Sequence, residues 1–175
     1  MGEVMKYFIG DLHLFDEGII KICNRPFSNA EEMANTLIKN WNGLIKSEDE
    51  VYVVGDVASE GTNWDNVRGI ITQLNGTKYL IKGNHDTLKN STYRKIGFDE
   101  AYDKPIIIDG FWIVSHEPMF VTDMSPYANI YAHVHNNPNY TDYSSRGFCV
   151  SAERTNYTPV SMDYIKECTR RKNLG

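Results

Sequence analysis

Cysteine is scarce in this chain, and its spacing excludes two common roles. The three cysteines, Cys23, Cys149 and Cys168, lie far apart in a sequence of 175 residues, and no two of them form a C-x-x-C pair. An odd, scattered set of this kind indicates neither a disulfide framework nor a structural zinc site. Free thiols fit a reducing compartment, so we expect a cytoplasmic protein.

The chain also lacks long apolar runs and any excess of positive charge. Its longest apolar stretches, such as 51–54 and 106–108, have the length of a strand, far below the roughly 20 residues that span a bilayer. No apolar run follows a basic start, so the N-terminus does not resemble a secretory signal. With 18 Lys and Arg against 23 Asp and Glu, the formal charge is −5. We therefore expect neither membrane association nor a stable nucleic-acid complex held by bulk electrostatics.

No repeat, low-complexity stretch or linker divides the chain, so residues 1–175 are predicted to form a single domain. Short β-rich runs bounded by Gly, Asp or Asn predict strands at 6–9, 51–54, 78–82, 105–108, 111–114, 129–132 and 147–150. Asp109-Gly110 lies between two of these runs and predicts a two-residue hairpin. We expect an α/β fold with mixed sheets.

Three helical patterns accompany the strands. The first has Ser28 as its expected N-cap and Glu31 three residues later, as in a capping box, and its apolar stripe ends near Leu44. The other two patterns span 64–74 and 161–172. Basic residues at the end of the last pattern suit the negative end of a helix dipole, which explains them without a ligand.

All five histidines, together with polar neighbours, follow predicted strands. They form short motifs directly after apolar runs: Asp11-Leu12-His13, Gly55-Asp56, Gly83-Asn84-His85-Asp86, Ser115-His116 and His133-Val134-His135. The carboxyl ends of strands in an α/β sheet are where ligands bind. In D-x-H and H-x-H, two side chains of an extended segment face the same side and can hold one ion or two neighbouring ions.

The residue types in these motifs indicate a metal centre. Carboxylates, imidazoles and an amide oxygen favour divalent transition ions, with Mn preferred and Fe, Zn, Co or Ni as alternatives, over Mg or Ca. The donors outnumber the needs of one ion. Two ions about 3.5–4 Å apart, bridged by a carboxylate, commonly activate a hydroxide and clamp a phosphate. We therefore expect two divalent ions.

In this order, over residues 11–135, the motifs resemble the calcineurin-like metallophosphoesterase superfamily. The stretches 23–27 and 156–161 are similar to small single-domain bacterial and phage members, so the resemblance covers nearly the whole chain. It implies the metallo-dependent phosphatase fold, a four-layer αββα sandwich of two mixed β-sheets flanked by helices. One departure is Ala132, where the superfamily usually has glycine, and the extra methyl puts the local backbone geometry in doubt.

The resemblance also implies a role for each motif residue. The implied ligands form two sets and a bridge: Asp11, His13 and His135 for one ion, Asn84, His116 and His133 for the other, and Asp56 between them. His85 would donate a proton to the leaving alkoxide or steady transition-state charge, with Asp86 as its orienting partner. A hydroxide bridging the metals would attack the phosphorus, so no protein nucleophile is required.

Other enzyme classes fit these motifs less well. The H-x-H of amidohydrolase barrels lies early in a chain of roughly 250 residues, whereas here it lies late in a shorter one. A metallo-β-lactamase would need an acid where Asn137 stands. No G-x-S-x-G elbow occurs, so Ser115 is not expected to be a nucleophile.

Several residues near the motifs are candidate substrate contacts. Arg25 could clamp a phosphate, because a guanidinium forks onto its oxygens, although a packed or exposed arginine is the slightly favoured alternative. Arg154 is a weaker candidate of the same kind. Four tyrosines flank the H-x-H segment and could stack on a base, although ordinary packing is more common: Tyr127, Tyr131, Tyr140 and Tyr143.

Three function hypotheses follow. The first is a phosphoesterase for a small, for example nucleotide-derived, phosphoester, with diesters favoured over monoesters because a poor alkoxide leaving group benefits from a proton donor such as His85. The second is a catalytically silent interaction scaffold of the same fold, which we would expect to have lost a ligand or His85. The third is a nuclease acting on short nucleic acid. The sequence carries no signal for an oligomeric state.

Overall fold

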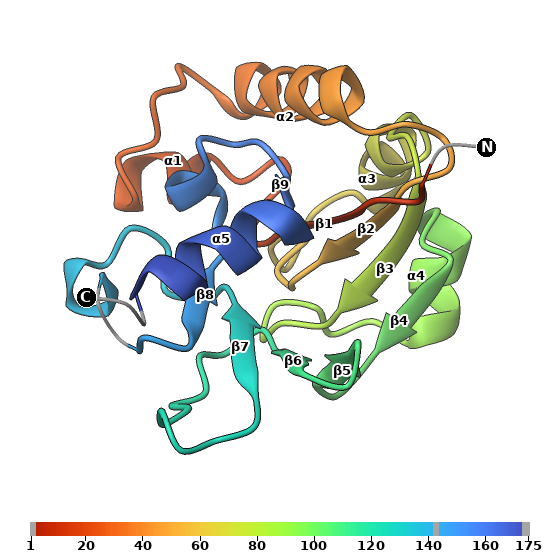
Figure 1. Cartoon of the computed structure of the whole chain (residues 1–175). Coiled ribbons are helices and arrows are strands. Elements are labelled where there is room, and N and C mark those ends of the chain that lie inside the picture. The colour runs from red at the N-terminus through yellow and green to blue at the C-terminus, as the bar shows by residue number, and fades with distance from the viewer. Residues whose placement is uncertain (1–2, 142–143, 173–175) are drawn as a thin grey trace.

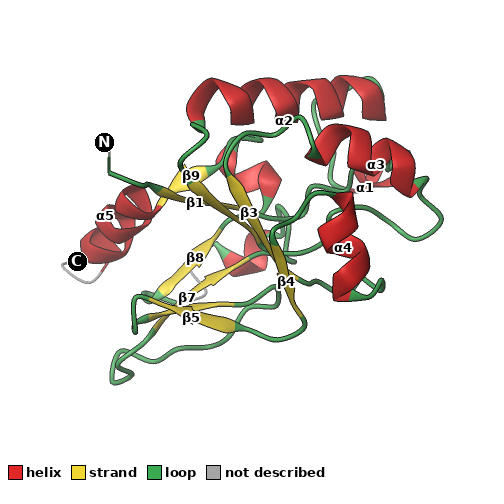
Figure 2. Cartoon of the chain, turned by 90° about the vertical axis from the view of Figure 1, so that its right-hand side faces the viewer, coloured by secondary structure: helices red, strands yellow, loops and turns green. Residues whose placement is uncertain are grey.

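Two β-sheets pack face to face and are flanked by helices (Figures 1 and 2). The computed structural model describes residues 3–141 and 144–172, so Tyr143, one of the four candidate stacking residues, lies outside the described part. The described helices are α1 (Glu17–Ile22), α2 (Ala30–Leu44), α3 (Trp64–Ile71), α4 (Asn90–Ile96) and α5 (Met162–Lys172), with short 3₁₀ turns η1 (Pro138–Tyr140) and η2 (Ala152–Thr155). None of these helices is both long and apolar enough to cross a bilayer.

The first sheet has the strand order β4-β3-β2-β1-β9. Its strands are β1 (Lys6–Ile9), β2 (Glu50–Val53), β3 (Thr77–Ile81), β4 (Glu100–Tyr102) and β9 (Val160–Ser161). The first four run parallel, and β9 lies antiparallel to β1. The motifs that follow β1, β2 and β3 therefore emerge at one edge of this sheet.

The second sheet has the order β5-β6-β7-β8. Its strands are β5 (Ile106–Ile108), β6 (Trp112–Val114), β7 (Ala128–Tyr131) and β8 (Gly147–Cys149). β5 and β6 form the expected antiparallel hairpin, and β6, β7 and β8 run parallel. Asp109 and Gly110 at the hairpin turn have φ angles of 53° and 66°, as a type I′ turn requires. Both sheets are mixed, and the predicted fold class is confirmed.

The helix predictions hold with shifted boundaries. The cap of α2 is Asn29 rather than Ser28, because the Asn29 side chain accepts from the backbone N of Glu32 at 2.8 Å. Glu32, not Glu31, then closes the box by accepting from the Ser28 backbone N at 2.7 Å. The second pattern is helical only to Ile71. Its last residues form turns, and the third pattern is α5.

The apolar side chains form two cores, one on each face of the first sheet. One core lies between this sheet and helices α1 to α4 and includes the fully buried Met33 and Trp41. The other lies between the sheets, where Phe8 and Ile130 pack with Ile165 of α5. Figure 2 shows α5 at one side of the two sheets, away from the other helices. This double packing holds the strand ends of both sheets in fixed positions.

The two sheets are joined by backbone hydrogen bonds just after β1. The Gly10 N donates to the carbonyl of Val150 at 2.8 Å, and the Ala152 N donates to the carbonyl of Gly10 at 3.0 Å. A Cβ on Gly10 would lie 2.5 Å from the Cβ of Ala132 and 2.7 Å from the carbonyl oxygen of Val54. The methyl group of Ala132 is therefore accommodated because residue 10 has no side chain.

We predict that Gly10→Ala lowers the free energy of unfolding by about 1–3 kcal/mol, because the new methyl overlaps packed atoms that cannot easily withdraw. Gly43→Ala is the matched control, since a Cβ there meets nothing within 4 Å. In the helical setting of Gly43, alanine should raise the same free energy by about 0.5–1 kcal/mol. Urea denaturation of both variants measures the difference, and equal effects would contradict the close packing at Gly10.

Candidate metal centre

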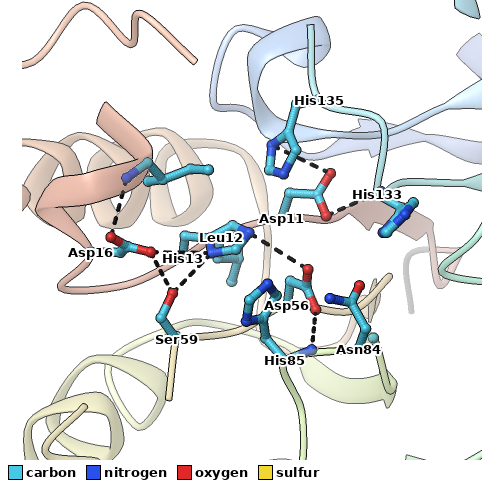
Figure 3. A network of polar contacts seen from close by, with 12 residues as sticks. Asp11, Leu12, His13, Asp16, Asp56, Ser59, Asn84, His85, His133 and His135 are labelled. Atoms are coloured by element: carbon cyan, nitrogen blue, oxygen red, sulfur yellow. Dashed lines mark hydrogen bonds and ion pairs between the residues drawn. The ribbon is translucent and has the colours of Figure 1, made fainter. Parts of the chain in front are cut away.

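The predicted motifs converge beyond the carboxyl ends of β1, β2, β3, β6 and β7. Figure 3 shows the side chains of Asp11, His13, Asp56, Asn84 and His135 pointing toward a common centre. Backbone hydrogen bonds join the segment after β1 to the loop after β2 within this region. The bonds run from Asp11 N to Gly55 O and from His13 N to Asp56 O, each 3.0 Å long.

The first group of potential ligands consists of Asp11, His13 and His135, whose ligand atoms all lie within 4.8 Å of one another. Asp11 and His13 are almost fully buried. Within residues 3–141 and 144–172, the buried atoms Asp11 Oδ2 and His13 Nε2 find no hydrogen-bond partner. Since buried polar atoms nearly always have a partner, these unpaired atoms fit a cation bound between them.

The second group consists of Asp56, His116 and His133, with ligand atoms again within 4.8 Å. His116 Nε2 lies 3.1 Å from His133 Nδ1 and 3.1 Å from Asn84 Oδ1. The four residues predicted to surround the second ion are therefore together. Two ring nitrogens and an amide oxygen in such close contact are a suitable donor set for a divalent transition ion.

Asp56 belongs to the second group and also faces the first. Its Oδ2 atom is 3.6 Å from His13 Nε2 in the first group and 3.4 Å from His116 Nε2 in the second. Its Oδ1 atom accepts from the His85 backbone N at 3.0 Å, which holds the carboxylate in place. This position suits a carboxylate shared by two ions.

Outer partners orient the imidazole rings. His116 Nδ1 donates a hydrogen bond to the carbonyl of Val54 at 2.9 Å, which leaves Nε2 facing Asn84 and His133. On His13, Nδ1 lies 3.3 Å from Ser59 Oγ, and Ser59 donates in turn to Asp16, the N-cap of α1 (Figure 3). Such contacts set which nitrogen is available to a metal.

Glu153 of η2 contacts one of the potential ligands, and no motif in the sequence points to it. Its Oε1 atom lies 2.9 Å from His135 Nδ1, so Nε2 of that ring is left for a metal. Burial opposes ionisation of Glu153, but the hydrogen bond with His135 and the charge of Arg25 lower its pKa to about 2. No spacing rule links residue 153 to the H-x-H motif, so only the fold reveals this contact.

Arg25 is not placed to clamp a phosphate. Its guanidinium is fully buried and donates to Glu153 Oε1 from Nε at 2.9 Å and from Nη2 at 2.7 Å. It also donates to the backbone carbonyls of Asp11 and Leu12, at 2.8 and 3.1 Å. The packed alternative for Arg25 is therefore the correct one, and its role is to hold the first metal motif against Glu153.

Arg154 is also engaged by backbone rather than free for substrate. It donates to the carbonyls of His135 and Asn137, both at 2.6 Å. Of the candidate stacking tyrosines, Tyr131 is buried in its strand, whereas Tyr140 borders a cavity beside His133. Tyr140 is therefore the one candidate from that set which the described structure places next to the ligand groups.

Asp86 has a different position from the one expected. Its buried carboxylate accepts from the backbone N of Asp56 at 2.7 Å and of Gly83 at 2.8 Å, and from the hydroxyl of Tyr93 at 3.3 Å. Burial raises the pKa of Asp86. The prediction that Asp86 orients the His85 ring is thus not supported, because its oxygens tie the loop after β2 to the loop after β3.

His85 is exposed beside the ligand groups. Its ring centroid lies 5.3 Å from that of His13, and the two rings meet edge to face. In Figure 3 the ring lies next to Asp56. The described structure thus places an accessible imidazole within reach of a molecule held at the ligand groups.

Two glycines make room for the ligands. A Cβ on Gly83 would lie 2.3 Å from Asp56 Oδ1, and one on Gly55 would lie 2.2 Å from His116 Nδ1. Gly55 also has a φ angle of +79°, which disfavours other residues. The glycines in the Gly55-Asp56 and Gly83-Asn84 motifs are therefore steric requirements of the site.

The backbone of the ligands is itself unusual. Several ligand residues have φ angles in the left-handed region: Asp11 at 55°, His13 at 47°, Asp56 at 54°, His133 at 70° and His135 at 49°. A non-glycine residue in this region costs of order 1–3 kcal/mol. Strain concentrated on potential ligands is typical of a site whose geometry serves function rather than stability.

Burial and neighbouring charged groups shift the pKa values of the potential ligands. Burial raises the pKa of Asp11 and lowers that of His13 to about 4. For His116, burial acts in the opposite sense to the hydrogen bond and charge of Asp56, and the net effect raises its pKa to about 9. Asp56, paired with His116 despite its burial, has a pKa lowered to about 2.

Comparison with known proteins agrees with this geometry. Carboxylates and histidines gathered at the strand ends of a two-sheet sandwich are suitable for holding divalent metal ions. The profile of the calcineurin-like phosphoesterase family matches residues 7–173, so the chain belongs to that family. It is therefore a metal-binding hydrolase acting on phosphoesters, and the predicted family is confirmed.

Relatives of the chain occur in archaea, bacteria and phages. The uncharacterized protein MJ1445 of Methanocaldococcus jannaschii is 36% identical over 170 residues, covering 91% of this chain and 88% of the relative. The gene 66 protein of Mycobacterium phage L5 is 35% identical over 81 residues, or 46% of this chain and 39% of the phage protein. The crystal structure of AQ665, a protein of unknown function from Aquifex aeolicus, aligns with a TM-score of 0.76 at 26% identity, covering 94% of this chain and 99% of AQ665.

We predict that Glu153→Gln weakens binding of divalent ions by about 10- to 100-fold, because His135 loses the charged partner that orients it. A titration against a competing chelator measures this loss, and Glu31→Gln on the exposed surface of α2 is the matched control. Since the change also leaves Arg25 without its carboxylate, thermal unfolding in EDTA must show that the variant still folds. Unchanged metal affinity in a folded variant would exclude the role given to Glu153.

Proposed function

We propose that this protein is a dinuclear metal-dependent phosphoesterase that prefers phosphodiesters to phosphomonoesters. The observation that carries the proposal is the position of Asp56, within 3.6 Å of a ligand nitrogen in each of the two groups. The proposal assigns one ion to Asp11, His13 and His135, the other to Asn84, His116 and His133, and Asp56 to both. The family match over residues 7–173 supports one domain spanning residues 1–175.

The donor set supports Mn as the physiological ion, with Fe, Zn, Co or Ni as alternatives. When bound, the two ions would supply a bridging hydroxide as nucleophile and polarise the phosphoryl oxygens. The chain's own contribution is to hold the ligands rigidly, through Asp86 between two loops and through Glu153 behind His135. Three free thiols support a cytoplasmic location.

His85 is the proposed general acid. Its exposed ring beside Asp56 can reach the ester oxygen of a bound substrate and donate a proton as that oxygen leaves. An alkoxide needs this proton because it is a poor leaving group, whereas a nitrophenolate does not. The role therefore favours esters of ordinary alcohols.

Two cavities beside the ligand groups support a diester substrate. One, of about 450 Å³, is bordered by Asn84, His116 and Met119. The other, of about 350 Å³, is bordered by His133, Ile22 and Tyr140. A phosphodiester has two arms, one for each cavity, while a monoester has one. The volumes suit a small, for example nucleotide-derived, ester better than duplex nucleic acid.

We expect Mn-reconstituted protein to hydrolyse bis-nitrophenyl phosphate faster than mononitrophenyl phosphate. Asp56→Asn should lose bound metal and activity together, because it weakens the shared anion, while Asp65→Asn on the exposed start of α3 should change neither. Paired assays of turnover and metal content make the comparison. Cleavage of short oligonucleotides, cyclic dinucleotides and duplex DNA, assayed side by side, tests the nuclease alternative. Absence of turnover in protein that has both ions bound would favour the scaffold alternative.

His85→Asn should leave metal content nearly unchanged. It should lower turnover of an alkyl diester by about a hundredfold or more, and that of the nitrophenyl diester by less than about tenfold, because only the alkoxide needs the proton. Steady-state assays on the two substrates, with metal analysis of the same samples, test this. Equal losses on both substrates would rule out the proton-donor role.

A further inference from the structure

A third cavity lies at the opposite end of the second sheet from the ligand groups. It has a volume of about 370 Å³ and is bordered by Asp109, Phe111, Trp112, Ala128, Arg146, Lys166, Thr169 and Arg170. Trp112 and Ala128 begin β6 and β7, and Arg146 directly precedes β8. The ligands His116 and His133 follow the other ends of β6 and β7. The sheet therefore separates this cavity from the metal centre.

The side chains that border the cavity are more basic than acidic, unlike the composition of the whole chain. Arg146, Lys166 and Arg170 border it, although the chain as a whole has a formal charge of −5. Asp109, the carboxylate that borders it in the described part of the chain, is already paired with Lys6 at 2.5 Å. Lys166 faces Asp163 at 3.9 Å across exposed surface. The charge balance favours an anionic occupant.

Arg146 shows where the anion would bind. Its Nε atom is buried and has no hydrogen-bond partner among the residues that the structure describes. Its backbone is fixed, since Asn129 N donates to its carbonyl at 2.8 Å and its own N donates to Ser144 Oγ at 3.1 Å. Burying an N–H group without an acceptor is unfavourable, so a ligand that supplies an acceptor at this position would be stabilised. The position of Arg170 near the C-terminal end of α5 is explained by the helix dipole, whereas Arg146 lies outside any helix and has no such explanation.

The inner wall of the cavity is aromatic. Trp112 and Ala128 are almost fully buried, and the rings of Phe111 and Trp112 meet edge to face with centroids 5.1 Å apart. A flat apolar group packs well on such a wall. The basic side chains beside it can bind the charged group of the same ligand. The volume is within the range of small-molecule sites.

We propose that this cavity is a second ligand site, which binds an organic phosphate with an aromatic body, of the size of a mononucleotide. The phosphate accepts from Arg146 and pairs with Lys166 and Arg170, and the aromatic body lies against Trp112 and Phe111. Because the site is at the amino ends of strands whose carboxyl ends lead to metal ligands, it is placed to sense a small phosphorylated metabolite without competing for the metal centre.

The test is a calorimetric titration of adenosine monophosphate into the metal-loaded protein. Two binding events are expected. Arg146→Gln should weaken one of them by at least about tenfold while leaving hydrolysis of bis-nitrophenyl phosphate within about twofold of the original. Asp56→Asn should remove the other event and spare the first. Arg94→Gln, which alters an exposed arginine paired with Glu100, should change neither.

Titrations of two smaller molecules test whether both parts of the ligand are recognised. Adenosine and inorganic phosphate should each bind at least about tenfold more weakly than the monophosphate, because each supplies only half of the contacts. If Arg146→Gln unfolds the protein, Lys166→Gln with Arg170→Gln on the surface of α5 replaces it. Two results would overturn the proposal. One is a single binding event that is lost in Asp56→Asn and unaffected by the cavity variants. The other is two binding events that both persist in the cavity variants.

Discussion

The metal centre depends on how the backbone is paired in the few residues after β1. Gly10 bonds with Val150 and Ala152 beyond β8, while Asp11 and His13 bond with the loop after β2. One short segment thereby fixes the distance between the two sheets at the point where their ligands meet. Arg25 strengthens the same segment by binding the Asp11 and Leu12 carbonyls and Glu153 together. Each group of potential ligands takes residues from both sheets, so neither group could assemble without this junction.

The potential ligands themselves adopt conformations that lower the stability of the folded chain. Their left-handed backbone conformations and the buried, unpaired Asp11 Oδ2 and His13 Nε2 both oppose folding of the metal-free chain. Tight packing elsewhere compensates, through a core on each face of the first sheet. A bound cation would relieve the unpaired atoms, so metal binding and folding stability are coupled in this protein.

Most of the site could be predicted from sequence because its motifs are local and follow apolar runs that form strands. The ligands in Asp11-Leu12-His13 and His133-Val134-His135 are of this kind, and the hairpin at Asp109-Gly110 has an equally local cause. Glu153 and the roles of Arg25 and Asp86 could not be predicted, since they depend on contacts between distant segments. Short elements such as β9 and α4 also gave no periodic signal, because two to seven residues are too few to show one.

The contact between Arg25 and Glu153 spans 128 positions of the chain, and that between His133 and Asp11 spans 122. During synthesis, the first motif is therefore complete long before its partners leave the ribosome. Contacts of such long range form late in folding. A nascent chain that ends before β8 has Asp11 and His13 but neither Glu153 nor the backbone clamp on Gly10. In such a chain the first group of potential ligands would lack both Glu153 and the junction between the sheets, so this part of the site is complete only once the C-terminal segment has been made.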